Sequence, residues 1–180
     1  MMTLVIGGAA SGKSEFAEAL ARQFASPRVY IATMQPFGEE ALARIRKHRD
    51  RRARMGFTTL ECYTGLATAC DTLPGNASVL LECLGNLVAN ERYSPDGGGE
   101  GAALAGVLCL ADRCRDLVVV TNEVFSGGSD YEGDTLGYLR ELANANRALA
   151  ARADRVVELT VGLPNWLKGG PTQSEEENPY

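Results

Sequence analysis

Six short runs of β-branched and aliphatic residues recur along the chain, separated by polar or glycine-containing segments. They cover residues 3–6, 28–33, 57–62, 78–83, 117–122 and 155–161. Runs of this length and composition are typical of buried β-strands, because a strand that is covered on both faces has no polar side. The pattern therefore predicts six strands.

The intervals between these runs show helical spacing. Apolar residues recur at steps of three and four in segments such as 16–24 and 136–149. Strands that alternate with helices form mostly parallel sheets with helices on both faces. We therefore expect a three-layer α/β/α fold with a mostly parallel sheet, and the chain length favours one domain over residues 1–170.

Two loops between the expected elements are rich in glycine and acidic residues, namely 94–101 and 126–134. This composition is typical of mobile surface loops, and both are candidate lids over a substrate. Residues 171–180 have few apolar side chains to bury, so we expect a flexible C-terminal tail.

The chain is acidic as a whole but basic in one short segment. Seven of its 18 lysines and arginines lie between residues 44 and 54, where Asp50 is the one acid, whereas the net charge of the whole chain is −5. A basic patch confined to one segment argues against general affinity for nucleic acid or membranes. It favours a local anionic ligand.

The five cysteines do not form the pattern of a disulfide framework or a zinc site, because their number is odd and no Cys-x-x-Cys pair occurs. We expect reduced, mostly buried thiols. The N-terminus has neither the basic start nor the long apolar stretch of a signal peptide or membrane span. We therefore expect a cytoplasmic protein without stable membrane insertion.

The segment GGAASGKS carries the clearest chemical signature in the chain. It matches the phosphate-binding pattern G-x-x-x-x-G-K-[ST] and lies between an expected strand and an expected helix, as that motif requires. Glycines let backbone N–H groups turn toward phosphates, Lys13 adds a positive charge, and Ser14 offers a hydroxyl to Mg²⁺. The residues predicted to bind the nucleotide are Gly7, Gly8, Ala9, Ala10, Ser11, Gly12, Lys13 and Ser14.

A phosphate-binding loop needs an acidic residue near its metal ion, normally at the end of a neighbouring apolar strand. Glu82 and Glu123 both follow such a run. Either carboxylate is suited to the metal ion, and the periodicity of the sequence does not choose between them.

His48 is the only histidine in the chain and lies within the basic segment RIRKHRDRR, residues 44–52. At helical spacing it shares one flank with Arg44, Arg51 and Arg52. Neighbouring positive charges lower the pKa of an imidazole below its usual value of about 6.5, which leaves the ring neutral and nucleophilic at neutral pH. Two other interpretations stay open here, a solvated basic helix face and a nucleic-acid grip, although the segment lacks the aromatic residues typical of the latter.

These segments together resemble the bifunctional adenosylcobinamide kinase and adenosylcobinamide-phosphate guanylyltransferase family of cobalamin biosynthesis. The resemblance rests on GGAASGKS, YIAT at 30–33, the basic segment, TLEC at 59–62, LLEC at 80–83, VTNEV at 120–124 and NRALAARADRVVELTVGLP at 146–164. It covers nearly the whole chain.

This resemblance implies a P-loop, RecA-like fold and a two-step transferase. ATP or GTP phosphorylates adenosylcobinamide, and GTP then transfers GMP through a guanylylated histidine to give adenosylcobinamide-GDP and pyrophosphate. The resemblance further implies that His48 is this histidine, that Lys13 is catalytic, and that the enzyme is a homotrimer. The other implied nucleotide contacts are Ala32, Thr33, Met34, Arg49, Asp50, Arg51, Arg52, Glu61 and Glu82, with Ser14 and Glu82 at the Mg²⁺ ion.

The chain departs from the family at Ala10, where arginine is common, so one cation is missing near the phosphates. Nucleotide binding is therefore a firmer expectation than efficient phosphoryl transfer. Two alternatives remain: a P-loop kinase of another small alcohol in which His48 is structural, and a RecA-like ATPase that binds nucleic acid with its basic helix.

Overall fold

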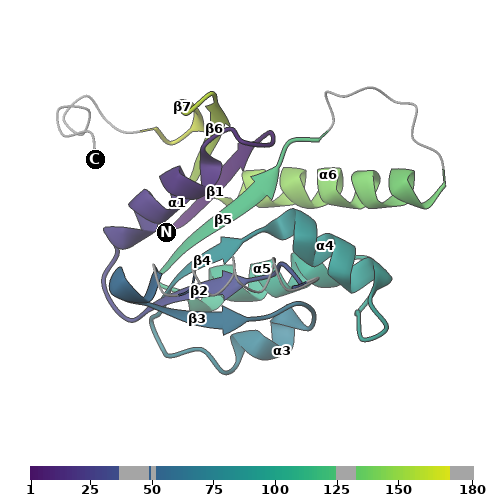
Figure 1. Cartoon of the computed structure of the whole chain (residues 1–180), viewed down its shortest axis with the longest axis horizontal. Coiled ribbons are helices and arrows are strands. Elements are labelled where there is room, and N and C mark those ends of the chain that lie inside the picture. The colour runs from purple at the N-terminus through teal and green to yellow at the C-terminus, as the bar shows by residue number, and fades with distance from the viewer. Residues whose placement is uncertain (37–48, 50–51, 125–132, 171–180) are drawn as a thin grey trace.

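The computed structural model describes residues 1–36, 49, 52–124 and 133–170. In these residues a seven-stranded sheet has the order β3-β2-β4-β5-β1-β6-β7 (Figure 1). The strands are β1 Met2–Gly7, β2 Arg28–Ala32, β3 Phe57–Glu61, β4 Ser78–Glu82, β5 Asp116–Asn122, β6 Arg155–Thr160 and β7 Leu163–Lys168. Neighbouring strands are parallel except for β6 and β7. The six predicted strands and the mostly parallel sheet are confirmed, and β7 adds an unpredicted antiparallel edge.

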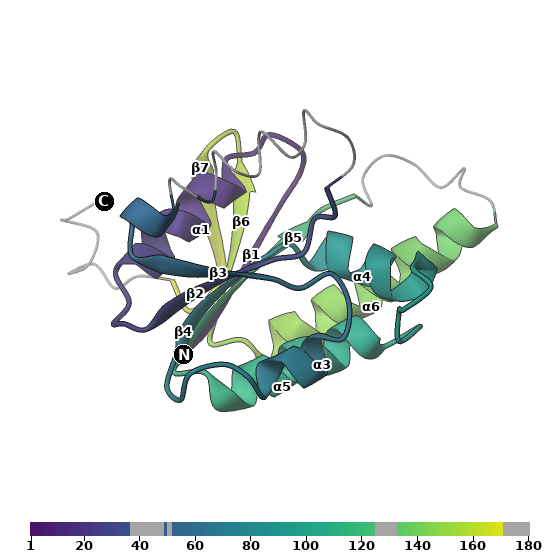
Figure 2. The same ribbon diagram turned by 60° about the horizontal axis from the view of Figure 1, so that its bottom comes forward.

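Helices cover both faces of this sheet. They are α1 Lys13–Arg22, α3 Leu66–Cys70, α4 Leu84–Tyr93, α5 Ala102–Arg113 and α6 Asp134–Arg152. Helix α1 lies on one face, and α3 to α6 lie together on the other (Figures 1 and 2). The three-layer α/β/α architecture is therefore confirmed. In the part of the chain that the structure describes, no helix combines the length and apolar character needed to cross a bilayer.

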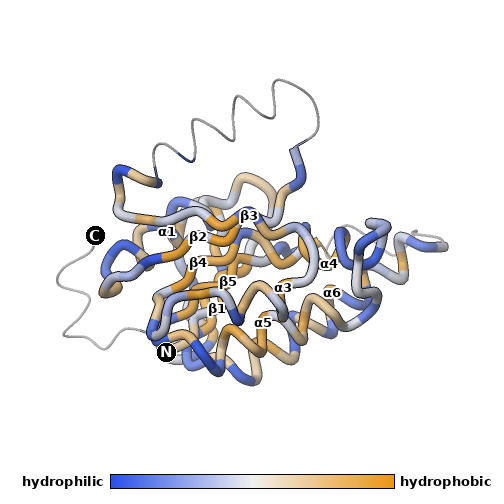
Figure 3. Tube along the Cα trace, turned by 90° about the horizontal axis from the view of Figure 1, so that it is seen from below, coloured by the Kyte–Doolittle hydropathy of each residue, from blue (hydrophilic) through white to orange (hydrophobic). Residues whose placement is uncertain are grey.

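The central strands are hydrophobic along most of their length (Figure 3). Their alternate residues supply two separate cores. Leu81 and Val119 pack with the α3 to α6 layer, whereas Leu80 and Val118 pack under α1 with Ala17. Consecutive strand residues point to opposite faces, so each strand contributes to both cores. This packing holds the sheet rigidly between its helix layers.

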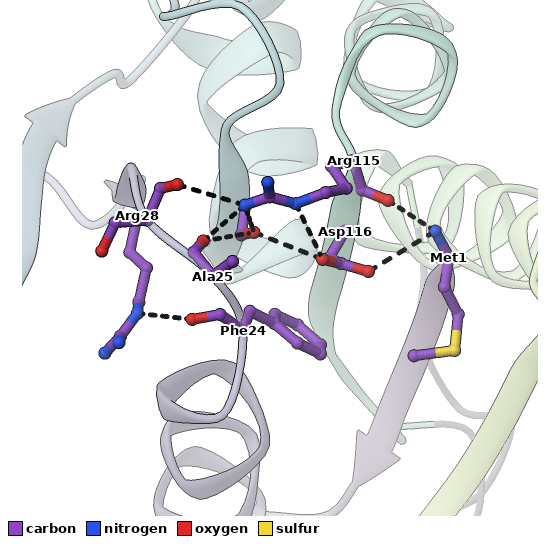
Figure 4. Close-up of polar contacts among 8 residues, drawn as sticks. Met1, Phe24, Ala25, Arg28, Arg115 and Asp116 are labelled. Carbon is purple, nitrogen blue, oxygen red and sulfur yellow. Dashed lines mark hydrogen bonds and ion pairs between the residues drawn. The ribbon is translucent and has the colours of Figure 1, made fainter.

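Polar contacts join the amino ends of the central strands to one another (Figure 4). Arg115 donates from its guanidinium to the carbonyl of Ala25 at 2.6 Å, and its own carbonyl accepts from the amino group of Met1 at 2.6 Å. Asp116 lies 3.7 Å from the same amino group. Because parallel strands share one direction, their carboxyl ends meet at the opposite edge, where α/β proteins bind ligands.

The glycine-rich loop 94–101 is held by two carboxylates rather than left free. Glu91, which is 1% exposed, accepts from the N–H groups of Gly65 at 2.8 Å and Gly98 at 2.7 Å. Glu141 of α6 accepts from the N–H group of Gly101 at 2.9 Å. The expectation of a mobile lid is therefore wrong for this loop. Residues 125–132 and the expected tail, 171–180, lie outside the described residues.

We expect that replacing the buried Glu91 with alanine destabilises the fold by about 2 kcal/mol, because two backbone N–H groups lose a charged acceptor. Urea denaturation measures this change in the free energy of unfolding. Glu100→Ala is the control, since Glu100 is 76% exposed and 3.9 Å from Arg92, and its loss changes stability by less than about 0.5 kcal/mol. Equal effects of the two substitutions would show that Glu91 does not hold the loop.

Candidate active site

The phosphate-binding loop joins β1 to α1 at the carboxyl edge of the sheet. Gly12 ends the loop with a φ of 88°, a left-handed conformation that favours glycine. The ammonium of Lys13 folds back and donates to the carbonyl of Gly8 at 2.9 Å. The N-terminus of α1 thus faces the loop, as in sites that bind phosphate, and the predicted strand–loop–helix context is confirmed.

The turn between β6 and β7 contacts the phosphate-binding loop and supports its conformation. The N–H group of Gly162 donates to the carbonyl of Ser11 at 2.9 Å. A Cβ on Gly12 would come within 3.2 Å of the Cα of Gly162, so the two backbones are in close contact. The loop conformation is therefore fixed by residues from the far end of the chain.

We expect that Gly7→Ala weakens both the fold and nucleotide binding, because the new Cβ would lie 2.9 Å from the carbonyl oxygen of Leu159 and closer still to the Ser11 hydroxyl. A loss of about 2 kcal/mol in the free energy of unfolding is expected from such overpacking. Gly8→Ala is the matched control, since a Cβ there meets nothing within 4 Å. Denaturation curves that coincide for the two variants would contradict the close packing at Gly7.

A pocket of about 400 Å³ lies at the carboxyl ends of the strands. Its lining consists of Lys13, Ser14, Glu15, Glu18, Tyr30, Ala32, Met34, Arg52, Glu61, Tyr63, Glu82, Cys83, Asn86, Val120 and Asn122. The strand register brings these residues together, because Gly7 lies opposite Asn122 and Ala32 lies opposite both Glu61 and Glu82. The loop and the strand-end glutamates therefore belong to one site.

Glu82 links the phosphate-binding loop to the floor of the pocket. The hydroxyl of Ser14 donates to Oε1 of Glu82, and the hydroxyl of Tyr30 donates to Oε2 at 2.7 Å. Strand β5 separates β4 from β1, so Glu82 reaches across one strand to Ser14. Glu123 does not line the pocket. The geometry thus favours Glu82 as the acidic partner of the loop.

The oxygens of Ser14 and Glu82 suit a Mg²⁺ ion, which prefers hard oxygen ligands. Among the residues that the structure describes, no group of three or more His, Cys, Asp or Glu side chains could hold a metal ion. A Mg²⁺ ion here would therefore take most of its ligands from phosphates and water, as is usual for nucleotide sites.

The two described arginines of the basic segment, Arg49 and Arg52, each form an ion pair with a glutamate. Arg52 is buried, with its Nε 3.7 Å from Oε1 of Glu18. Arg49 is exposed, and its Nη1 lies 4.0 Å from Oε1 of Glu61. These ion pairs offset part of the positive charge that, from the sequence, we expect to attract an anionic ligand.

Residues 32–34 divide between the pocket and the interior. Ala32 and Met34 line the pocket. Thr33 is fully buried, and its hydroxyl donates to the carbonyl of Cys83 at 2.8 Å while accepting from the Cys83 N–H group at 2.7 Å. The Thr33 side chain therefore joins the ends of β2 and β4 and is not turned to the pocket.

Three of the predicted site residues, His48, Asp50 and Arg51, lie outside the described residues. The structure adds pocket residues that were not among the predicted site residues, chiefly Glu18, Tyr30, Asn86 and Asn122. The two-residue period of a strand was a usable signal for Tyr30, because it places Tyr30 on the same face as Ala32.

Cys83 contributes the thiol in the lining of the pocket. Burial raises the pKa of this thiol above its ordinary value. Since the thiolate is the nucleophilic form, Cys83 stays protonated and unreactive near neutral pH. The described lining therefore offers phosphate-binding and acidic groups, but its thiol is not an activated nucleophile.

Comparisons with known proteins agree with this chemistry. Residues 3–167 match the model of a family described as cobinamide kinase / cobinamide phosphate guanyltransferase. The chain is 36% identical to the bifunctional adenosylcobalamin biosynthesis protein CobU of Salmonella typhimurium, covering 93% of this chain and all of the relative. It is 33% identical to CobP of Pseudomonas aeruginosa, which bears the same description, covering 95% of this chain and 99% of the relative.

Solved structures with low sequence identity share the fold. The flagellar accessory protein FlaH from Methanocaldococcus jannaschii matches with a TM-score of 0.53 and 12% identity, covering 96% of this chain and 81% of that protein. An ATPase of a bacterial type III secretion system matches with a TM-score of 0.51 and 12% identity, covering 98% of this chain and 60% of that protein. Together with the phosphate-binding loop, these likenesses place the domain in the P-loop ATPase fold.

Proposed function

The chain belongs to the cobinamide kinase / cobinamide phosphate guanyltransferase family, and we propose that one pocket carries out both reactions in sequence. It is a transferase of cobalamin biosynthesis. The observation that carries the proposal is the hydrogen bond from Ser14 to Glu82, which joins the phosphate-binding loop to an acidic strand end. Nucleoside triphosphates and adenosylcobinamide are the substrates.

In the first reaction, the γ-phosphoryl group of ATP or GTP passes to the aminopropanol hydroxyl of adenosylcobinamide. The bond between the γ-phosphorus and its bridging oxygen breaks, a bond to the hydroxyl oxygen forms, and the hydroxyl proton leaves to solvent. The N–H groups of residues 7–14 hold the phosphates, and the Lys13 ammonium neutralises the charge that develops during transfer. Ser14 and Glu82 would hold a Mg²⁺ ion, which would supply positive charge to stabilise the transferring phosphoryl group.

In the second reaction, an imidazole nitrogen of His48 attacks the α-phosphorus of GTP, and pyrophosphate leaves with the electron pair of the broken bond. A phosphate oxygen of adenosylcobinamide phosphate then attacks the same phosphorus and displaces the imidazole. The product is adenosylcobinamide-GDP. The resemblance of the basic segment to the family motif supports His48 in this role.

We also propose that the enzyme works as a homotrimer in the cytoplasm, with small molecules rather than nucleic acid as its partners. The resemblance to the family supports the trimer. The acidic net charge outside the segment 44–54, where seven of the 18 lysines and arginines gather, supports the absence of nucleic acid. Sedimentation velocity at micromolar concentration measures the mass of the assembly, and a monomer would contradict the trimer.

The two half-reactions are tested separately. Incubation with Mg²⁺, adenosylcobinamide and ATP labelled at the γ-phosphate should transfer label to the corrinoid. Incubation with GTP labelled at the α-phosphate, without corrinoid, should label the protein with an adduct that is labile in acid and stable in alkali, as expected of a phosphorus–nitrogen bond.

The outcomes separate the alternatives. Phosphorylation without any protein adduct would favour a kinase of a small alcohol in which His48 is structural. Salt-sensitive binding of oligonucleotides with stimulated ATP hydrolysis would favour a nucleic-acid-dependent ATPase. Failure of both labelling reactions would overturn the proposed function.

A further inference from the structure

Tyr30 lines the pocket and contacts both Glu82 and Arg52. It lies on β2, is 3% exposed, and lines the same pocket as Ser14 and Arg52. Tyr30 is not among the site residues predicted from the sequence, because an aromatic residue in a buried strand normally belongs to the core. Its two specific contacts, one by the hydroxyl and one by the ring, distinguish it from an ordinary core residue.

The hydroxyl of Tyr30 fixes the carboxylate of Glu82. Glu82 uses one oxygen for Ser14 and the other for Tyr30, so each oxygen has its own donor. Burial, together with the negative charge of Glu82, raises the pKa of the Tyr30 hydroxyl, which therefore stays protonated as a donor. Without that donor, the carboxylate would be free to rotate about its last bond, and its orientation toward Ser14 would be lost.

The ring of Tyr30 fixes the guanidinium of Arg52. The Cζ atom of Arg52 lies 3.5 Å from the ring centroid, a separation typical of a cation–π contact. Among the described residues, the buried Nε of Arg52 has no hydrogen-bond partner, and the carboxylate of Glu18 lies 3.7 Å away, beyond hydrogen-bond distance. The face of the ring is therefore a main contact that holds this guanidinium in place.

Arg52 follows His48 by four residues in the sequence and lies at the end of the same basic segment. One buried side chain therefore connects the acidic partner of the phosphate-binding loop with the segment that carries the proposed nucleophile.

We propose that Tyr30 is a positioning residue for both half-reactions: its hydroxyl holds Glu82 toward Ser14, and its ring holds the guanidinium of Arg52 in the pocket. This inference rests on the proposed function, since it assigns the contact with Glu82 to Mg²⁺ binding and the contact with Arg52 to guanylyl transfer. It predicts that the two contacts can be removed separately, with different consequences.

Tyr30→Phe removes the hydroxyl and keeps the ring. We expect the gain in affinity that Mg²⁺ gives to a fluorescent guanosine diphosphate to fall about tenfold, because Glu82 loses a hydrogen bond to a charged group. The affinity measured in EDTA should stay unchanged. Tyr93→Phe is the matched control, since its hydroxyl donates to the carbonyl of Asp134 outside the pocket, and its Mg²⁺ dependence should equal that of the wild type.

Tyr30→Leu removes the ring as well as the hydroxyl. We expect the rate of labelling by GTP labelled at the α-phosphate to fall about tenfold below that of Tyr30→Phe, at saturating nucleotide and Mg²⁺. Arg52→Met removes the other half of the ring contact and should slow labelling to a similar extent. The double variant should be no slower than either single variant, because both remove the same contact.

Equal Mg²⁺ dependence in Tyr30→Phe and the wild type would overturn the inference. So would an affinity that falls equally with and without Mg²⁺, because a general loosening of the pocket would then explain the loss. Additive losses in the double variant would overturn the role of the ring. A wild-type protein that binds no guanine nucleotide would instead contradict the proposed function itself.

Discussion

Replacing His48 with alanine should abolish labelling of the protein by GTP labelled at the α-phosphate and lower guanylyl transfer by about 1,000-fold or more. The imidazole is the proposed acceptor of GMP, and a methyl group offers no nucleophile. Phosphorylation of adenosylcobinamide by ATP should continue near the wild-type rate, because that reaction uses Lys13 and the phosphate-binding loop. Label retained on acid-quenched protein, together with label on the corrinoid, measures both reactions in one set of samples.

His48→Asn is the matched variant, because its amide keeps the polarity and part of the size of the imidazole without its nucleophilic ring. It should lose labelling as completely as His48→Ala. Labelling of either variant at the wild-type rate would place the covalent acceptor on another residue. Loss of phosphorylation in both variants would instead mean that His48 supports the whole pocket.

Lys13→Met should lower both half-reactions, phosphorylation by about 1,000-fold, because it removes the ammonium that stabilises charge on the transferred phosphoryl group. The effect is amplified by the acidity of the pocket, whose lining also holds Glu15, Glu18, Glu61 and Glu82. Without Lys13 the triphosphate meets these carboxylates with less opposing charge. Steady-state phosphorylation of adenosylcobinamide and the affinity for nucleotide in EDTA measure the loss.

Lys168→Met is the control for this substitution. Lys168 also donates from its ammonium to backbone carbonyls, at the end of α6, and does not line the pocket. Its loss should leave both reactions within about twofold of the wild type. If Lys13→Met retains the wild-type rate of phosphorylation, the segment 7–14 does not hold the reacting phosphates.

The six buried strands could be predicted because each is a continuous apolar run, covered by helices on both faces. Strand β7 lacks this signal. Leu163 is 68% exposed and Leu167 is 60% exposed, and the strand pairs with β6 alone at the edge of the sheet. Pro164, which lacks an N–H donor, is also typical of edge positions. Edge strands therefore give a weak sequence pattern.

The choice between Glu82 and Glu123 depended on tertiary contacts, which the local sequence does not encode. Both residues end apolar runs, and only the tertiary contact between Glu82 and Ser14 shows which carboxylate faces the loop. The pairing of Arg52 with Glu18 depended on the same kind of information, because α1 must first lie over β4 and β5. The chemistry of the loop was thus predictable, and the partners of its side chains were not.

The contacts that hold loop 94–101 could not be predicted from the local sequence either. Its glycines and acids are typical of a mobile segment, and its composition gives no sign of the hydrogen bonds that hold it. Those bonds come from Glu91 and Glu141, on helices before and after the loop. Tertiary contacts of this kind override composition, because each buried carboxylate needs donors.

The position of β1 between β5 and β6 has a consequence for how the protein is made. The phosphate-binding loop is translated before the strands that it depends on, because β1 finds its strand partners only when residues 116–122 and 155–160 have been synthesised. The turn at Gly162 that supports Ser11 emerges later still. The loop therefore reaches its final surroundings only after these later strands have formed, so a bound nucleotide reports that nearly the whole domain has folded.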